Sequence, residues 1–335
     1  MAFDAEHADS MIARAWADEL IPQLEEYITI PALSPAFDPD WAANGHIGQA
    51  TDQIENWIRS RPVEGMTVWR QEIEGRTPLV VARIDAFGPD ADTAADAPTT
   101  VLYGHLDKQP EMTGWRDDLG PWTPVREGDR LYGRGGADDG YAAFASLAAI
   151  EAVQASGGNH PPLVVLIEAS EESGSPDLPA HIETLLADPA AGLGQVDLVV
   201  CLDSGCATYD TVWLTTSLRG LVGGTLQIDI VTEGLHSGSA GGVIPSTFRI
   251  MRSLLDRVEE AGDGSITLAS ANVDIPEYRY DEAKATAEML GNGVLESPPL
   301  IAGATTMVET PLDALLARTW KPSLSYTGLD GMPPT

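Results

Sequence analysis

Two adjacent carboxylates follow a short apolar run in the middle of the sequence. The run "PPLVVLIEAS" is typical of a buried strand, and Glu171 and Glu172 come directly after it, before Ser-Gly-Ser. Neighbouring like charges repel each other, so such a pair at the end of an apolar element is costly unless cations or protons lie nearby. The pair therefore belongs either to a solvated loop or to a cation site.

Three other segments carry imidazole or carboxylate groups at similar points. The run "TTVLYGHLDKQP" contains His105 and Asp107 at the end of its apolar part. "LYGRGGADDG" brings Asp138 and Asp139 to the start of a predicted helix, and "VDLVVCLD" ends in Asp203. Alone, each segment is explained by a helix cap, a turn or surface charge. Successive groups are a little over 30 residues apart, about one strand, helix and connection, so each arrives from a new unit. Together they predict a cation site.

The surrounding segments alternate between helix and strand patterns. Helical periodicity covers residues 8–28, 47–60, 139–155 and 177–188. Strand-like runs cover residues 66–74, 77–86, 99–107, 161–170 and 196–205. This alternation predicts an α/β fold with a mostly parallel sheet and helices on both faces. In such sheets the ligand site lies beyond the carboxyl ends of the strands, where these polar residues occur.

Composition excludes several classes of partner. The chain has 51 acidic and 19 basic residues, a formal net charge of −32, and such a surface repels nucleic acid and anionic membranes. No apolar run reaches about 18 residues, and the start, "MAFDAEHADSMIARAWADEL", is acidic where a signal peptide would be basic and then apolar. We expect a cytoplasmic protein with no nucleic-acid or membrane partner. The two cysteines form no CxxC pair, so a thiolate zinc site is not expected.

Five motifs in fixed order carry a family resemblance: "GHLDKQP", "GWRDDLGPWTPV", "LYGRGGADDG", "EASEESGS" and "VVCLDSG". They resemble the co-catalytic di-zinc metallopeptidase family of carnosine-type dipeptidases, glutamate carboxypeptidase, aminoacylase, acetylornithine deacetylase and succinyl-diaminopimelate desuccinylase, and most of all its dipeptidase branch. The resemblance implies a zinc-peptidase-like, mostly parallel sheet covered by helices on both faces. It also implies an inserted α+β ferredoxin-like lid through which two subunits form a homodimer.

The resemblance assigns four residues to two divalent metal ions in each subunit. His105 and Asp203 would bind one ion, and Glu172 would bind the other. Asp138 would bridge both ions. Mixed imidazole and carboxylate ligation suits zinc, with manganese or cobalt as alternatives.

Two further residues receive roles beside the metals. Asp107 would hold the imidazole of His105 in the right tautomer. Glu171 would be the general base, because divalent ions lower the pKa of the water they bind from about 16 toward 7, where a glutamate can accept its proton. Glu171 would pass that proton to the leaving amine of a peptide bond. The adjacent glutamates thus present one ligand and one base from a single turn.

The pattern changes after Asp203. Period-2 alternation from about residue 213 and a glycine-rich turn precede an amphipathic helix predicted at 245–261. By the resemblance, residues 1–213 are the N-terminal part of the catalytic domain, and residues 214–335 are an incomplete lid and dimerisation domain. His236, in "EGLHSG", matches the lid histidine that enters the partner subunit's active site and stabilises the carbonyl oxyanion. A purely structural loop histidine is the alternative.

One departure from the family concerns the second metal. Relatives supply a histidine ligand from a segment after the lid, whereas this sequence stops at "SLSYTGLDGMPPT", still within it. None of the six histidines stands in that position: His7, His46, His105, His160, His181 and His236. The lid arginine that would bind the substrate carboxylate is absent as well. We therefore expect a chain truncated at its C-terminus, with a shortened family scaffold as the alternative.

The expected function is metal-dependent hydrolysis of dipeptides or short peptides with a free C-terminal carboxylate. An N-acyl amino acid deacylase of the same family is the nearest alternative. A non-catalytic relative that acts as a scaffold or binding protein is another. The intact Glu171 favours an enzyme, because a binding protein needs no general base beside a metal ligand.

Overall fold

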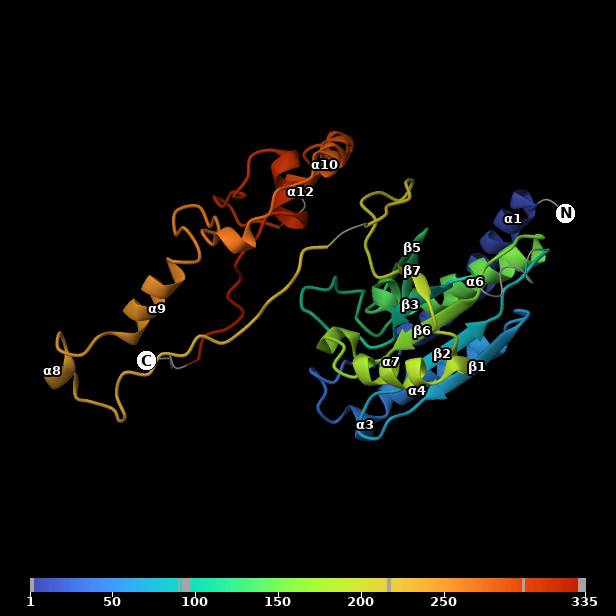
Figure 1. The fold of residues 1–335 in the computed structure, drawn as a ribbon, viewed down its shortest axis with the longest axis horizontal. Helices are drawn as coiled ribbons and strands as arrows, with labels where there is room; N and C mark the ends of the chain where they lie inside the picture. The colour runs from blue at the N-terminus through green and yellow to red at the C-terminus, as the bar shows by residue number, and fades with distance from the viewer. Residues whose placement is uncertain (1–2, 90, 92–96, 216–217, 297–298, 331–335) are drawn as a thin grey trace. The chain divides into compact units, whose positions relative to one another are not determined.

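The computed structural model describes residues 3–89, 91, 97–215, 218–296 and 299–330 (Figure 1). The chain divides into two compact units, residues 1–205 and residues 206–335. All four predicted metal ligands lie in the first unit. The predicted domain boundary after residue 213 stays a prediction.

A five-stranded sheet organises the first unit. Its strands are β1 (Met66–Gln71), β2 (Leu79–Ile84), β3 (Thr99–His105), β6 (Leu163–Glu168) and β7 (Val196–Cys201), in the spatial order β1-β2-β6-β3-β7. Strands β6, β3 and β7 are parallel, and β2 is antiparallel to both of its neighbours. The sheet is therefore mainly parallel, as predicted, with β2 as the exception. The short connection from β1 to β2 explains it, since a parallel crossover needs a dozen or more residues.

Helices cover both faces of this sheet. On one face, α2 (Ile21–Ile28), α4 (His46–Arg59) and α6 (Tyr141–Ala155) share a buried cluster with alternate residues of β2 and β6, and α1 (Ala5–Ala15) packs along α6. On the other face, α7 (Leu178–Ala187) packs through Leu185 against the remaining residues of those strands. Each of these helices was predicted from periodicity. The central strands β2 and β6 are buried on both faces, which is why they are almost continuously apolar, whereas the edge strand β7 is largely exposed.

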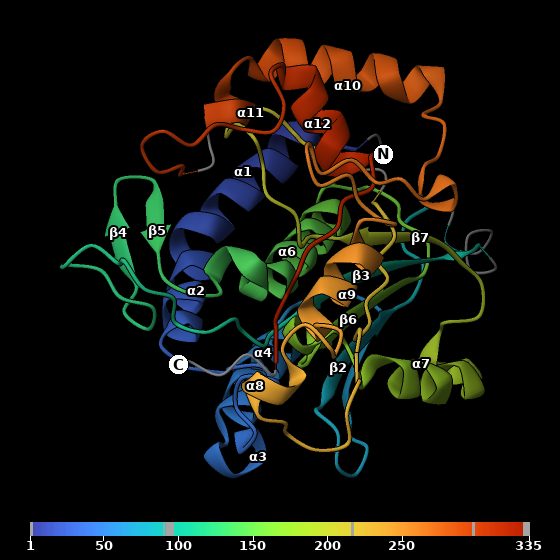
Figure 2. The same ribbon diagram turned by 90° about the vertical axis from the view of Figure 1, so that its left-hand side faces the viewer.

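Smaller elements surround the end of the sheet that carries the polar motifs. A hairpin of β4 (Val125–Glu127) and β5 (Arg130–Tyr132) lies apart from the main sheet, as Figure 2 shows, and was not predicted. A tight turn over Gly136–Gly140 precedes α6, and a single helical turn, Glu171–Ser173, follows β6. The short α3 (Trp41–Asn44) precedes α4. These turns bring the acidic motifs to the carboxyl ends of the strands.

The second unit is helical in its described residues. Its helices are α8 (Ser237–Ala240), α9 (Thr247–Leu255), α10 (Glu277–Leu290), α11 (Gly293–Glu296) and α12 (Pro311–Thr319). The amphipathic helix predicted at 245–261 corresponds to α9. The strand predicted from residue 213 is absent, and the described part of this unit contains no sheet strand, so the expected ferredoxin-like sheet is not seen. Alternation alone does not make a strand, because a strand needs a second backbone with which to pair.

The described residues bear on the expectations about membrane spans and about the two cysteines. None of their helices combines the length and the apolar composition that crossing a membrane requires. Cys201 and Cys206 are both free and exposed.

Candidate metal centre

His105 is the buried centre of the site. It is the last residue of β3, and its side chain has no exposed surface. Its Nδ1 lies 3.0 Å from the backbone carbonyl oxygen of Asp107. A ring N–H at Nδ1 that donates to this carbonyl leaves Nε2 as a lone pair, and in the described structure Nε2 is buried without any hydrogen-bond partner. A buried imidazole nitrogen without a hydrogen-bond partner is suited to bind a metal ion.

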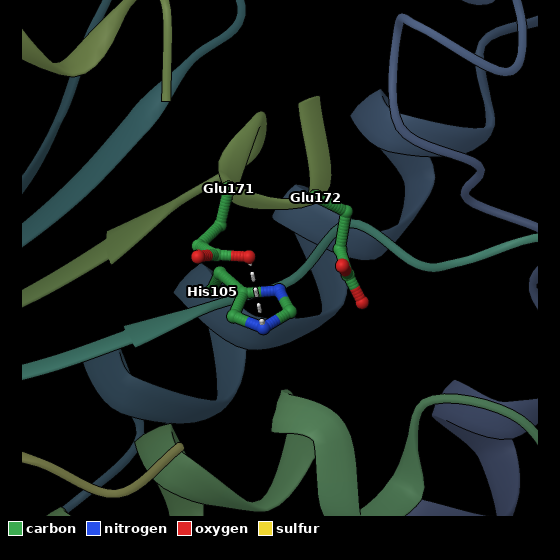
Figure 3. A group of neighbouring side chains, drawn as sticks. All are labelled: His105, Glu171 and Glu172. Carbon is green, nitrogen blue, oxygen red and sulfur yellow. Dashed lines mark ion pairs between the residues drawn. The ribbon is translucent and has the colours of Figure 1, made fainter. Parts of the chain in front are cut away.

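Carboxylates from three other segments face this nitrogen. Asp138 Oδ1 lies 3.4 Å from His105 Nε2, and Asp203 Oδ2 lies 3.7 Å from it. Glu171 Oε2 is 4.0 Å away, and Figure 3 shows this carboxylate directed toward the imidazole. The segments that carry these groups are the end of β3, the turn before α6, the turn after β6 and the end of β7.

Two overlapping groups of side chains have the geometry of metal sites. His105, Asp138 and Asp203 form one, and His105, Glu171 and Glu172 form the other, with the ligand atoms of each group within 4.8 Å of one another. The structure thus brings together all four residues expected to bind metal and the expected base. Within the described residues, no histidine besides His105 belongs to either group. The division of the ligands between two ions remains a prediction.

The electrostatics of the cluster favour a bound cation. Burial raises the pKa of Glu171 and of Glu172, and the charges of Asp203 and of Asp138, respectively, raise them further. Burial lowers the pKa of His105, but the carboxylates of Asp107 and Asp138, 3.5 Å and 3.4 Å from its ring nitrogens, outweigh it and raise this pKa to about 11. The converging carboxylates thus stabilise a proton on His105, and they would stabilise a divalent cation in the same way. The donor set of one imidazole and several carboxylates fits zinc or manganese.

Asp107 contacts both the imidazole and the turn of the two glutamates. Its carboxylate Oδ1 lies 3.5 Å from His105 Nδ1, somewhat farther than the backbone oxygen of the same residue, and its predicted role in holding the imidazole stays a prediction. Its two carboxylate oxygens also accept hydrogen bonds from the backbone N–H groups of Glu171, at 3.1 Å, and Glu172, at 3.0 Å. Asp107 therefore joins the segment of the histidine to the turn of the two glutamates. Side-chain types could not predict that the backbone carbonyl of Asp107 would contact the imidazole.

Three further residues at the site were missed. Asp139 is fully buried, and its Oδ2 accepts a hydrogen bond of 3.2 Å from the backbone N–H of His105. Gln109 Nε2 donates to Glu172 Oε2 at 2.5 Å. Glu168, buried at the end of β6, accepts hydrogen bonds from the hydroxyls of Tyr103 and Ser175. All three lie within the quoted motifs, which was the available signal, although Asp139 also fits an ordinary helix cap.

A glycine allows the close packing around Asp139. A Cβ at Gly104 would lie 2.5 Å from the Cβ of Ala142 and 2.7 Å from Asp139 Oδ2. Any side chain at this position would therefore push the start of α6 and the Asp138–Asp139 turn away from β3. The "GH" pair of the sequence thus combines a predicted ligand, His105, with the space that lets the carboxylate of Asp139 approach β3.

Three of the other histidines have structural partners. His160 stacks on Phe87, with ring centroids 5.7 Å apart. His181 Nε2 lies 2.8 Å from the backbone oxygen of Thr77. His236, in the second unit, caps α8, where its Nδ1 accepts a hydrogen bond from the backbone N–H of Gly238. The role predicted for His236 at a partner's active site stays a prediction.

The comparison with known families agrees with this geometry. The model of peptidase family M20/M25/M40 matches residues 101–310, which include every predicted site residue. The chain belongs to this family. The match supports the resemblance inferred from the five motifs.

Individual relatives are dipeptidases by name. A cysteinylglycine-S-conjugate dipeptidase of Corynebacterium striatum is 29% identical over 254 residues, which are 73% of this chain and 52% of that protein. A Cys-Gly metallodipeptidase of Candida albicans is 30% identical over 269 residues, 76% of this chain and 50% of that protein. The M20 chain thus spans about half the length of these curated relatives.

A solved structure shares the fold. The di-peptidase Dug1p of Saccharomyces cerevisiae superposes with a TM-score of 0.64 at 22% sequence identity, and the match covers 100% of this chain and 69% of that one. This likeness bears on the fold alone.

Proposed function

We propose that this M20 protein is a metal-dependent dipeptidase. It would cleave dipeptides or short peptides that end in a free carboxylate. The observation that carries the proposal is the unpaired, buried Nε2 of His105 faced by carboxylates from three other segments. Family membership and the names of the relatives support the reaction class.

The residues of the chain suit distinct tasks in this reaction. Two divalent ions, zinc by preference, would supply a Lewis acid and an acidified water. His105 and Asp203 are proposed to hold one ion, Glu172 the other, and Asp138 both. Two such ions would also offset the repulsion among the clustered carboxylates.

Glu171 is the proposed general base. Its side chain is 32% exposed, so solvent and substrate can reach it. Burial raises its pKa above the ordinary range for glutamate, which favours a group that first accepts a proton and then releases it. It would take a proton from the attacking water and deliver it to the leaving amine. The neighbouring Glu172 accepts a hydrogen bond from Gln109 and belongs to the ligand group of His105 and Glu171.

The second unit supplies the remaining proposals. Residues 214–335 would form the lid and dimerisation domain, and His236 would stabilise the carbonyl oxyanion in the partner subunit of a homodimer. A cytoplasmic location is proposed from the sequence alone.

The test is a Glu171→Gln variant of the protein assayed on Cys-Gly and other dipeptides. We expect metal content to be retained and kcat to fall about 100- to 10,000-fold, the usual contribution of a general base. Full activity of this variant would remove Glu171 from the mechanism. A parallel panel of N-acetyl and N-succinyl amino acids separates a dipeptidase from a deacylase. Metal binding without turnover of either panel would favour a binding protein.

A further inference from the structure

A short segment outside the five motifs touches both elements that carry the site. Residues 27–36, here called the bracket, comprise the last turn of α2 and the chain that follows it, "YITIPALSPA". One part of the bracket contacts the chain just after His105, and another contacts the turn that carries Glu171 and Glu172. None of its residues was predicted to have a role.

The first anchor of the bracket is Lys108, three residues after His105. This lysine has no exposed surface. Its Nζ donates to the backbone oxygens of Tyr27 and Ile30, both at 2.7 Å, and lies 3.9 Å from the centre of the Tyr27 ring. The last carbonyls of a helix lack intrahelical partners and favour a cation, so the ammonium completes the end of α2.

The backbone strengthens this anchor. Lys108 N–H donates to Ala32 at 2.9 Å, and Ser34 N–H donates back to the carbonyl of Lys108 at 3.0 Å. The hydroxyl of the buried Tyr27 donates to the backbone oxygen of Leu106 at 2.7 Å. Burying an ammonium is costly unless it is hydrogen-bonded, so these contacts explain how a lysine is accommodated here. The bracket is therefore fixed to the chain on both sides of Asp107.

The second anchor is Ser173, the residue after Glu172. Its Oγ lies 2.5 Å from the Oγ of the fully buried Ser34. It also accepts a hydrogen bond of 2.8 Å from the backbone N–H of Ala36. The bracket thus holds the turn that presents both glutamates.

These contacts close a ring of interactions around the site. Asp107 already links the two elements through the N–H groups of Glu171 and Glu172. The bracket adds a second link, from Lys108 to Ser173 through Ser34. Two separate links prevent one element from rotating about the other, whereas a single link would allow it.

We infer that the bracket sets the spacing between His105 and the two glutamates, with Lys108, Ser34 and Ser173 as positioning residues. This inference rests on the proposed metal site. None of the three was predicted to bind metal, and none belongs to either ligand group, so they act through the ligands that they hold in place. Displacing a ligand by a fraction of an ångström weakens metal binding, as the loss of outer hydrogen bonds does in other metal sites.

The test is a metal titration of the apo-protein, with Zn²⁺ followed by calorimetry, on the wild type and on Ser34→Ala and Ser173→Ala. We expect each variant to bind metal about tenfold more weakly, the low end for residues behind the ligands. The double variant should be little worse than either single variant, because both substitutions break the same pair. Lys108→Met should have a larger effect, and the serine variants decide the question if it does not fold.

The matched control is Thr99→Val, which removes a hydroxyl at the opposite end of β3. Thr99 Oγ1 donates to the backbone oxygen of Gly192 at 2.8 Å, so its loss also separates two segments. We expect unchanged metal affinity in this variant. Equal weakening in Thr99→Val and Ser173→Ala, or unchanged affinity in Ser173→Ala, would overturn the role of the bracket. A wild type that binds no Zn²⁺ would instead overturn the proposed site itself.

Discussion

The two units of the chain use similar hydrophobic patterns with different results. In residues 3–205, alternating and periodic apolar residues form a sheet whose central strands are buried on both faces, and every predicted helix and strand is present. In the described residues of 206–330, the buried apolar side chains are Ala287, Val294, Ala314 and Leu316. Leu221 and Val222 there are 99% and 96% exposed, although they lie in a segment with a strand-like pattern.

The two units differ in how firmly they fix a potential ligand. A ligand needs neighbours that fix its position, and His105 has them because β3 lies between β6 and β7 in the first unit. His236 lies in an exposed turn whose contacts are local. The first unit therefore fixes its candidate metal ligands through its own sheet, whereas the described contacts of His236 stay within its own turn.

The largest effect is expected from substituting His105 of the first unit, compared with His236 of the second. His105→Ala should abolish measurable metal binding, with affinity reduced more than about 100-fold, since it removes the imidazole common to both ligand groups. His236→Ala should leave metal affinity unchanged and lower dipeptide turnover about 100-fold if it serves the oxyanion. Metal analysis and steady-state kinetics on the same preparations measure both quantities. Loss of metal in His236→Ala would show that the second unit takes part in ligation.

A second prediction compares the packing of the units. Phe144 is fully buried, and its ring lies edge-on to that of Trp57, with centroids 4.8 Å apart. Phe144→Ala should lower the free energy of unfolding by about 3–5 kcal/mol, whereas Leu221→Ala should change it by less than about 0.5 kcal/mol. Urea unfolding followed by circular dichroism gives both values.

The same pair of variants can sharpen the comparison. A loss of several kcal/mol in Leu221→Ala that depends on protein concentration would mean that a second subunit covers this segment in solution. Such a result would support the proposed dimerisation role of residues 214–335. A loss that does not depend on concentration would mean that the segment packs within its own chain.

The sequence predicted the cluster of acidic and imidazole groups better than it predicted the contacts behind it. His105, Glu172 and Asp203 follow strands whose carboxyl ends meet at one edge of the sheet, and Asp138 comes at the start of a helix beside them. The contact of the Asp107 carbonyl with the imidazole depends on the backbone conformation after β3, which side-chain types do not specify. Nothing local in "LDKQP" distinguishes a buried lysine that caps a distant helix from a solvated one. The antiparallel β2 could have been predicted, because its connection to β1 is too short for a crossover.

The second unit exposes a further limit of sequence patterns. Alternation in "LVGGTLQIDIV" suggests an apolar and a polar side, but nearly all of these residues are exposed, and the pattern does not supply a partner strand. In the first unit the partners come from neighbouring repeats of the strand and helix pattern, so periodicity and pairing agree. Period-2 alternation is thus a reliable predictor where several such segments follow one another and a weak one where the segment is isolated.

The smallest predicted effect is the pH dependence of stability that comes from Asp139, a buried carboxyl within the charged cluster of the first unit. Burial raises the pKa of this carboxyl to about 8, with Asp203 and Asp138 adding to the rise and His105 opposing it. The folded protein therefore keeps a proton that the unfolded chain releases above about pH 4. Stability from this group is fully present below that pH and is lost as the pH rises toward 8.

Asp139→Asn keeps the shape of the side chain and removes its titration. In metal-free protein we expect the stability of the wild type to fall between pH 5 and 8 by an amount on the order of 1–3 kcal/mol more than that of the variant. Urea unfolding at several pH values in the presence of a chelator measures the difference. The exposed Asp117→Asn is the control and should follow the wild-type profile. Parallel profiles for wild type and Asp139→Asn would mean that Asp139 is already ionised in the folded protein, and its hydrogen bond from His105 would then be charge-assisted rather than that of a neutral acid.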